Sequence, residues 1–270
     1  MPGIEDKLYS LSRFERLSLE DTPIHRIDPR VKIVLTLAFI ITVTSYDKYA
    51  VAPLLPFAAF PVLFAAAANL PGTFLIRRLL IVSPFAVAVG IFNPLFDREI
   101  LFSIGGLPIS GGWASFVSIL IRYSLCMSAA LVLTATTGFY RICTSLQSMR
   151  IPPVLTMQLL LLYRYIFLLS DEALRLSRAR TLRSFGAKAQ GIKSTGLLLA
   201  SLLLRTLQRA RCIHEAMSAR GLQLTLPQFE KPVIKKSDLI LAVFILTALA
   251  LLRFFDLTGV VGGLISGALG

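Results

Sequence analysis

The feature that most limits the fold of this chain is a series of four apolar runs in its first half. They cover Ile33 to Ser45, Ala50 to Leu70, Leu79 to Phe96 and Trp113 to Gly138. A spanning helix needs about 20 apolar residues, because the hydrocarbon core is about 30 Å thick and a helix rises about 1.5 Å per residue. The chain has 55% hydrophobic and 16% charged residues. It therefore has more apolar side chains than a soluble domain of 270 residues normally buries. The runs therefore predict an all-α, polytopic membrane protein.

Local signals refine these runs. Asp28 is a plausible N-cap, because Pro29 suits the first turn of a helix that leads into the first run. The second run predicts a kinked helix, because three prolines interrupt it: Pro53, Pro56 and Pro61. The glycine-rich stretch DREILFSIGGLPISGG after the third run predicts a loop. Arg122 lies inside the fourth run and is interpreted as a structural hydrogen-bond or ion partner, with a transport role as the alternative.

The second half of the chain contains a long basic region and one further span. Residues 139–236 break at Pro152 and Pro153, are apolar for several turns and then become strongly basic. A last run, Leu239 to Leu252, completes about five transmembrane helices. We therefore divide the chain into residues 1–138, with an N-terminal segment and four spans, a coupling-helix region at 139–236, and a final span with its tail at 237–270. The weakly apolar tail, residues 258–270, leaves a sixth span undecided.

Lysines and arginines are distributed unevenly, and this predicts the orientation. If the amino terminus is cytoplasmic, the cytoplasmic segments hold six basic residues between Lys7 and Lys32, Arg77 and Arg78, and sixteen between Arg141 and Lys236. The outside loops hold Lys48 and Arg98. Because cytoplasmic loops carry the excess of positive charge, we predict a cytoplasmic amino terminus and a cytoplasmic basic region.

Residues 171–222 read as two basic amphipathic helices, the second from about Ser194 to Arg220. In the first, apolar residues recur at every third position: Ala173, Leu176, Ala179, Leu182 and Phe185. In the second, a row has three- and four-residue spacing: Leu203, Leu207, Ala210, His214 and Met217. Arginines occupy the remaining surface. Each helix is therefore expected to have one face that packs and one that is solvated.

The ends of both helices carry arginine next to glycine. Gly221 follows Arg220 directly, and Gly186 lies three residues after Arg183. Glycine lets a helix stop in the left-handed region, and a terminal arginine favours the negative end of the helix dipole. The guanidinium also presents a fork of donors that suits a carboxylate. The alternative is a pair of membrane-surface helices that lie on anionic lipid.

Metal, disulfide and nucleic-acid chemistry are poorly supported. The three cysteines are far apart and odd in number, so we predict that Cys126, Cys143 and Cys212 are small packing residues. His25 and His214, the two histidines, have no partner at ligand spacing, so neither a bound metal nor another cofactor is expected. The net charge of +13 could suit nucleic acid. The positive charge is instead confined to segments between the apolar runs. This distribution is typical of a membrane protein whose basic segments set its orientation and contact acidic lipid.

Catalytic patterns are also missing from the sequence. The acidic residues that could serve an enzyme are interpreted as loop and helix-start charges: Asp97, Glu99, Asp171 and Glu172. No nucleophile and base occur at a suggestive spacing, so the chain is expected not to be an enzyme.

Taken along nearly its whole length, the chain resembles the transmembrane T component of energy-coupling factor (ECF) transporters, in particular the CbiQ family of cobalt and nickel importers. The resemblance rests on HRIDPRVK, FNPLFD, IPPVLTMQLLLLYRYIFLLSDEALRL and the two arginine motifs. Family members carry two Ala-Arg-Gly-like triplets at the ends of coupling helices that dock on two ATPase subunits. The second triplet corresponds fully to Ala219, Arg220 and Gly221. The first corresponds to Leu182, Arg183 and Ser184 in its arginine alone, and Arg180 remains an alternative.

The resemblance implies a scaffold in a prokaryotic cell membrane that couples two cytoplasmic ATP-binding subunits to a substrate-binding membrane subunit. Cobalt, or nickel, is the implied substrate, with a link to cobalamin biosynthesis, and the metal would be held by another chain. Two alternative hypotheses remain. The chain could be a membrane enzyme that acts on a lipid-linked substrate, or a lipid-bound structural protein. The first would depend on an acidic residue such as Asp28, Asp97 or Asp171.

Overall fold

The computed structural model describes residues 22–48, 50–93, 100–104, 107–183, 192–221 and 235–254. The chain divides into two compact units. The bundle unit comprises the described residues between 22 and 138 and between 235 and 254, and the arm unit comprises those between 139 and 221.

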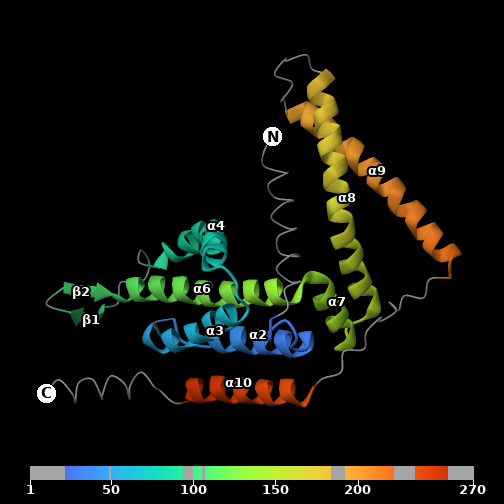
Figure 1. The fold of residues 1–270 in the computed structure, drawn as a ribbon. Coiled ribbons are helices and arrows are strands. Elements are labelled where there is room, and N and C mark those ends of the chain that lie inside the picture. Colours follow the sequence, from blue (N-terminus) through green and yellow to red (C-terminus); the bar gives the residue numbers. More distant parts are fainter. Residues whose placement is uncertain are drawn as a thin grey trace. The chain divides into compact units, whose positions relative to one another are not determined.

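The bundle unit is built from helices, as predicted, with one short hairpin. In chain order its elements are α2 (Pro29–Thr44), the 3₁₀ helix η1 (Ala52–Ala58), α3 (Ala59–Ala67), α4 (Gly72–Gly90), β1 (Ile100–Ile104), β2 (Leu107–Ser110), α6 (Gly111–Thr137) and α10 (Lys236–Phe254). Helix α6 contacts α4, α3 and α2, and α10 contacts the other side of α2 (Figure 1). The all-α, polytopic class is therefore confirmed.

The arm unit contains three helices: α7 (Phe139–Ser148), α8 (Pro153–Arg183) and α9 (Ile192–Ala219). Helices α8 and α9 are long and form an antiparallel pair (Figure 1). Arg150, with φ of 68°, and the Pro152-Pro153 pair separate α7 from α8, which is the predicted break. Helix α8 runs without interruption from an apolar half to a basic half.

The predicted start of the first span is also confirmed. Asp28 is the N-cap of α2, and its Oδ1 accepts a hydrogen bond from the Arg30 amide at 2.8 Å. Pro29 occupies the first helical position, where its missing N–H leaves no donor unpaired. At the other end of α2, Arg122 of α6 donates to the Asp47 carbonyl oxygen, in agreement with its interpretation as a structural partner.

Aromatic packing joins α2 to η1 and α3. The Phe39 and Phe60 rings stack with centroids 4.5 Å apart, and Phe39 has no exposed surface. The ring centroid of Phe57 lies 6.2 Å from that of Phe39. The buried residues around them form the core of the bundle unit: Val43, Leu54, Leu125, Ala129 and Leu249. The second apolar run thus packs as a 3₁₀ turn followed by a short α-helix, because Pro56 interrupts regular α-helical hydrogen bonding.

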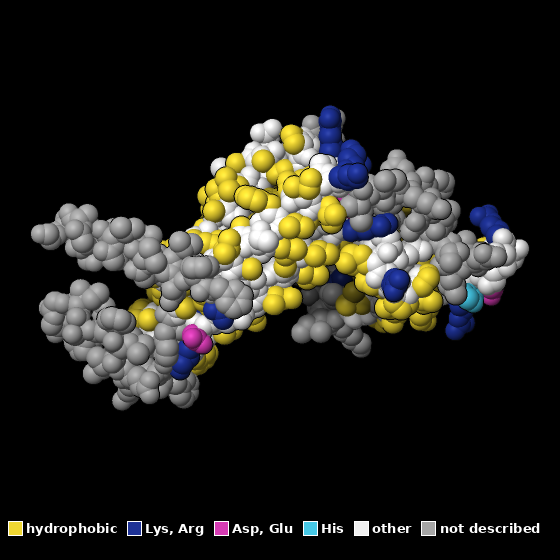
Figure 2. Space-filling model, turned by 90° about the horizontal axis from the view of Figure 1, so that it is seen from below, with side chains coloured by type: hydrophobic (Ala, Val, Ile, Leu, Met, Phe, Trp, Pro, Cys, Tyr) yellow, Lys and Arg dark blue, Asp and Glu magenta, His cyan; other side chains and the backbone are white. Residues whose placement is uncertain are grey.

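Three described helices are long and apolar enough to cross a membrane: α4, α6 and α8. The apolar face of α4 is open, with Ile76, Leu80 and Phe85 exposed by 59%, 65% and 74%. Figure 2 shows broad hydrophobic areas on one face of the molecule, with lysines and arginines in separate patches. An exposed apolar surface of this extent suits lipid or another membrane protein. The 16-residue α2 is shorter than a full span.

Two sequence predictions are wrong in detail. Helix α4 begins at Gly72, directly after Pro71, and not at Leu79, so Arg77 and Arg78 lie within its first two turns. Long arginine side chains can lie along an apolar helix and keep their charge in water, so their presence does not end it. The predicted loop between the third and fourth runs contains the antiparallel hairpin of β1 and β2. In the sequence two glycines separate the strands, which is a common hairpin signal.

The contact between α4 and α6 depends on Gly90. A Cβ atom at this position would lie 2.8 Å from Cδ2 of Phe116. Gly90→Val should therefore lower the free energy of unfolding by about 1 to 3 kcal/mol through overpacking. Thermal unfolding of the detergent-solubilised protein measures the loss. Gly72→Ala, where an added Cβ meets nothing within 4 Å, is the control. Equal melting temperatures for both variants would contradict this packing.

Candidate coupling site

The first predicted triplet lies at the end of α8. Helix α8 ends at Arg183, and Arg183 and Leu182 are both exposed, Leu182 by 78%. Ser184 and the predicted helix-ending Gly186 lie outside the described residues. The last turn of α8 thus presents basic side chains at the negative end of the helix dipole, where positive charge is favourable.

The second triplet forms a well-defined helix end. Ala219 is the last residue of α9, and the Arg220 amide donates to the carbonyl oxygens of Ala216 and Met217, each at 3.2 Å. Gly221 has φ of 63°, and its amide donates to the Ser218 carbonyl oxygen at 3.0 Å. The predicted left-handed stop at glycine is confirmed here. Arg220 is exposed at this tip.

An acidic residue in the middle of α8 sets the register between the two long helices. Glu172 forms ion pairs with Arg205 at 3.7 Å and Arg209 at 3.4 Å, both from α9. Nearer the end of α8, an Arg180 guanidinium N–H donates to Thr195 Oγ1 at 3.4 Å. The interpretation of Glu172 as a helix-start charge is therefore wrong, because α8 begins at Pro153. Asp97 and Glu99 lie outside the described residues.

This register separates Arg183 from Arg220. Each arginine lies about eleven residues, or roughly 16 Å, beyond the Glu172 ion pairs, and the helices run in opposite directions. Figure 1 shows the two helices running in opposite directions. Arg183 ends α8 and Arg220 directly follows α9, so the two arginines lie at opposite ends of the pair. Together they cannot form one binding site, but each can contact a separate partner.

The predicted packing row of α8 agrees with the structure at its centre, and that of α9 does not. Ala173, Leu176 and Ala179 are partly buried. In α9, by contrast, Leu203 and Leu207 are exposed by 59% and 51%. Partial burial in α9 falls mainly on a neighbouring row, Leu198, Leu202, Thr206 and Ile213, and Met217 is the one member of the predicted row that shares it. Helix α9 has apolar residues on more than one face, so periodicity alone could not identify the face that meets α8.

The described residues contain no cluster of side chains suited to binding a metal ion. No group of three or more His, Cys, Asp or Glu side chains that could hold a metal occurs there. Cys143 in α7 is buried, and burial raises the pKa of its thiol to about 11, so it stays a neutral packing group. Cys126 is partly buried. Cys212 is exposed, so the prediction that all three cysteines pack is wrong for this one.

Apolar helices joined to two long amphipathic helices with exposed arginine ends define a helical membrane scaffold. The family model described as the cobalt transport protein CbiQ matches residues 20–230. The chain therefore belongs to the CbiQ family, and it is a transmembrane (T) component of the energy-coupling factor type.

Named relatives agree with this assignment. The EcfT transmembrane protein of the energy-coupling factor transporter of Leuconostoc gelidum is 29% identical over 73% of this chain and 79% of its own length. The cobalt transport protein CbiQ of Salmonella typhimurium is 30% identical over 47% of this chain and 61% of its own length. An uncharacterized protein of Methanocaldococcus jannaschii is 24% identical over 90% of this chain and 86% of its own length. The two relatives with functional names are transporter components and not enzymes.

The α9 tip should depend on the positive φ of Gly221. An added Cβ at Gly221 meets nothing within 4 Å, so Gly221→Ala acts through backbone conformation, at about 1 kcal/mol or slightly more. Amide hydrogen exchange of the last turn of α9 should become several-fold faster. Gly196→Ala, at a helical position with open space, should not accelerate it. Equal exchange at Arg220 in Gly221→Ala and the unmodified chain would contradict the proposed helix stop.

Proposed function

We propose that this chain is a non-enzymatic scaffold that couples ATP hydrolysis by two cytoplasmic ATPase subunits to movement of a substrate-binding membrane subunit. The observation that supports it most is the placement of Arg183 and Arg220 at opposite ends of the α8 and α9 pair. One scaffold that must engage two copies of a motor needs two separate contact points. Two tips that face away from each other meet this need, and one shared pocket would not.

Each tip is chemically suited to an acidic groove on an ATPase. An arginine guanidinium offers five N–H donors in a planar fork, and a carboxylate can accept two of them at once. Of the two candidates at the end of α8, Arg183 is favoured, because Arg180 already contacts Thr195 of α9. Arg183 lies one turn further along and is exposed. We therefore assign the ATPase contacts to Arg183 and Arg220.

The apolar halves of the long helices are suited to a membrane partner. Near its start α9 exposes Leu197, Leu199 and Leu204 by 66%, 58% and 68%. On α8, Val154 and Leu162 are exposed by 47% and 61%. We propose that the substrate-binding subunit rests on these surfaces, and that closure of the ATPases shifts the tips and moves it. Cobalt is the proposed substrate, held by that subunit.

The proposed coupling can be tested by truncating the two arginines. Arg220→Ala and Arg183→Ala should each weaken co-purification with the ATPase subunits, because loss of one partner of a buried interfacial charge pair typically costs about 2 to 5 kcal/mol. Cobalt uptake by cells should fall with it. Arg211→Ala and Arg175→Ala, which remove exposed arginines from the same helices away from their ends, are matched controls. Unchanged assembly and uptake in both tip variants would refute the coupling role.

The proposed orientation places the basic end of α8 and helix α9 on the cytoplasmic side of a prokaryotic cell membrane. In a variant with Cys126→Ala and Cys143→Ala, the exposed Cys212 of α9 should react with a membrane-impermeant maleimide only after the cells are permeabilised. With Cys212 also replaced, a cysteine introduced by Lys48→Cys should react in intact cells. Labelling of Cys212 in intact cells would reverse the orientation.

A further inference from the structure

Charged side chains are buried at the amino-terminal end of α2, within the bundle unit. Asp28, Lys32 and Asp238 are exposed by 5%, 4% and 8%. All three occur where an apolar bundle would normally place small or apolar residues, because burying a charge is costly unless it is paired. The coupling tips lie in the other unit, so the proposed function gives these residues no role.

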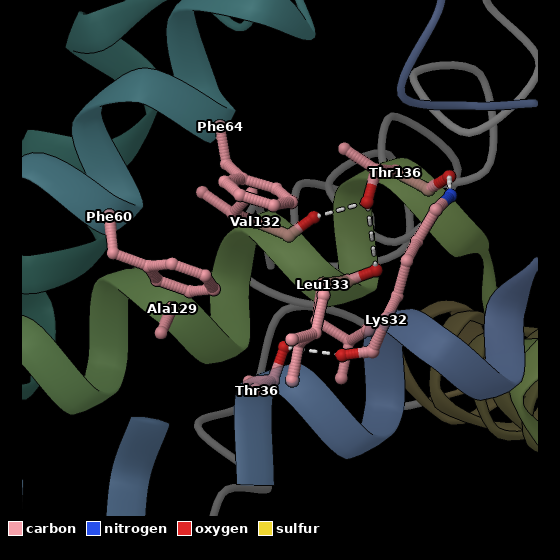
Figure 3. A pocket seen from close by; sticks show the side chains of 9 residues that line it. Lys32, Thr36, Phe60, Phe64, Ala129, Val132, Leu133 and Thr136 are labelled. Carbon is pink, nitrogen blue, oxygen red and sulfur yellow. Dashed lines mark hydrogen bonds between the residues drawn. The ribbon is translucent and has the colours of Figure 1, made fainter. Parts of the chain in front are cut away.

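Lys32 reaches from α2 to the last turn of α6. Its Nζ donates to the Thr136 carbonyl oxygen at 3.2 Å. Figure 3 shows the lysine side chain crossing from one helix to the other, on the far side of the pocket from Phe60. The last carbonyls of a helix have no partner within it, and they carry the negative end of the dipole. Lys32 therefore supplies to α6 the donor that a further helical turn would have provided.

The same end of α2 is joined to α10. The Asp28 amide donates to Asp238 Oδ2 at 3.1 Å, and Asp238 lies in the first turn of α10. One carboxylate oxygen of Asp28 caps α2, whereas the other is buried and has no hydrogen-bond partner in the described part of the chain. An unpaired buried acceptor costs free energy. The arrangement thus brings three helix ends together at some cost.

The end of α6 is also where the chain leaves the bundle unit. Thr137 is the last residue of α6, Gly138 turns with φ of 74°, and α7 begins at Phe139. The Gly138 amide still donates to the Thr134 carbonyl oxygen at 3.0 Å. Lys32 therefore holds α6 two residues before the point at which it connects to the arm unit.

We propose that Lys32 is a positioning residue for energy coupling. It anchors the carboxyl-terminal end of α6 to α2, so that force from the arm unit acts on the bundle unit instead of fraying the last turn of α6. This rests on the proposed function. Loss of Lys32 would leave the ATPase contacts of the arm unit in place and would reduce the transport obtained for each ATP hydrolysed.

The test uses the whole transporter, with its ATPase and substrate-binding subunits, in proteoliposomes. Uptake of radioactive Co²⁺ and ATP hydrolysis are measured together. For Lys32→Met the uptake for each ATP should fall several-fold while hydrolysis continues, and Lys32→Arg should restore part of it. A lysine needed only for folding would lower both rates in proportion to the amount of protein. An unchanged ratio in Lys32→Met overturns the proposal.

The matched control is Thr136→Val. It removes a hydroxyl that donates to the Val132 carbonyl inside α6, but it leaves the backbone oxygen that Lys32 contacts. Its coupling ratio should equal that of the unmodified transporter, and a loss as large as that of Lys32→Met would also overturn the proposal. If Lys32→Met is not recovered from membranes, Lys32→Leu, which also lacks a donor, is measured, with the same expected loss and the same overturning result.

A readout that needs no substrate separates this inference from the proposed function. Amide exchange at Thr137 and Gly138 in the full complex should become roughly tenfold faster in Lys32→Met, as expected for loss of a hydrogen bond from a charged group. It should stay unchanged in Thr136→Val. Absence of Co²⁺ uptake by the unmodified complex would count against the proposed substrate, and unchanged exchange in Lys32→Met would count against the anchor.

Discussion

The bundle unit depends on polar contacts at both ends of α2. A helix end leaves backbone groups without a partner inside the helix, and side chains of neighbouring helices can satisfy them. Helix α2 lies between α6 and α10, and a charged side chain takes part in the contact with each neighbour at each end. At the amino-terminal end these contacts are Lys32 to Thr136 and Asp28 to Asp238; at the carboxyl-terminal end they are Arg122 to Asp47 and Arg253 to Ser45. The Arg253 guanidinium also lies 4.4 Å from the Tyr46 ring centroid. These contacts set the positions of α6 and α10 along the axis of α2. Apolar packing alone would allow the helices to slide past each other.

The arm unit uses charge in a different way. Its central ion pairs, from Glu172 to Arg205 and Arg209, are partly exposed and are each worth about 1 kcal/mol or less, so they set register more than stability. The remaining arginines stay at the surface and at the tips. A bundle joined by charged contacts at its helix ends, and an arm that presents charges outward, is a suitable division for a scaffold that binds soluble partners.

Much of the candidate site was predictable because its signals are local. The end of α9 follows from Arg220 and Gly221, since a glycine that adopts positive φ ends a helix whatever the tertiary structure is. The packing face of α9 was not predictable, because both Leu203 and Leu198 lie on apolar faces and only the contact with α8 distinguishes them. Glu172 was misread for the same reason: its partners lie more than thirty residues away in the chain.

By itself the sequence determined that the chain is a helical membrane protein, where most of its helices begin and end, and that its positive charge gathers in one region. These properties depend on hydropathy and on residues within a few positions of each other. Only the tertiary structure decided that Arg183 and Arg220 lie at opposite ends of one helix pair, because this follows from the antiparallel register of α8 and α9. It also decided that Lys32 contacts Thr136, 104 residues away, because a buried lysine must find an acceptor and the nearest helix end supplies one.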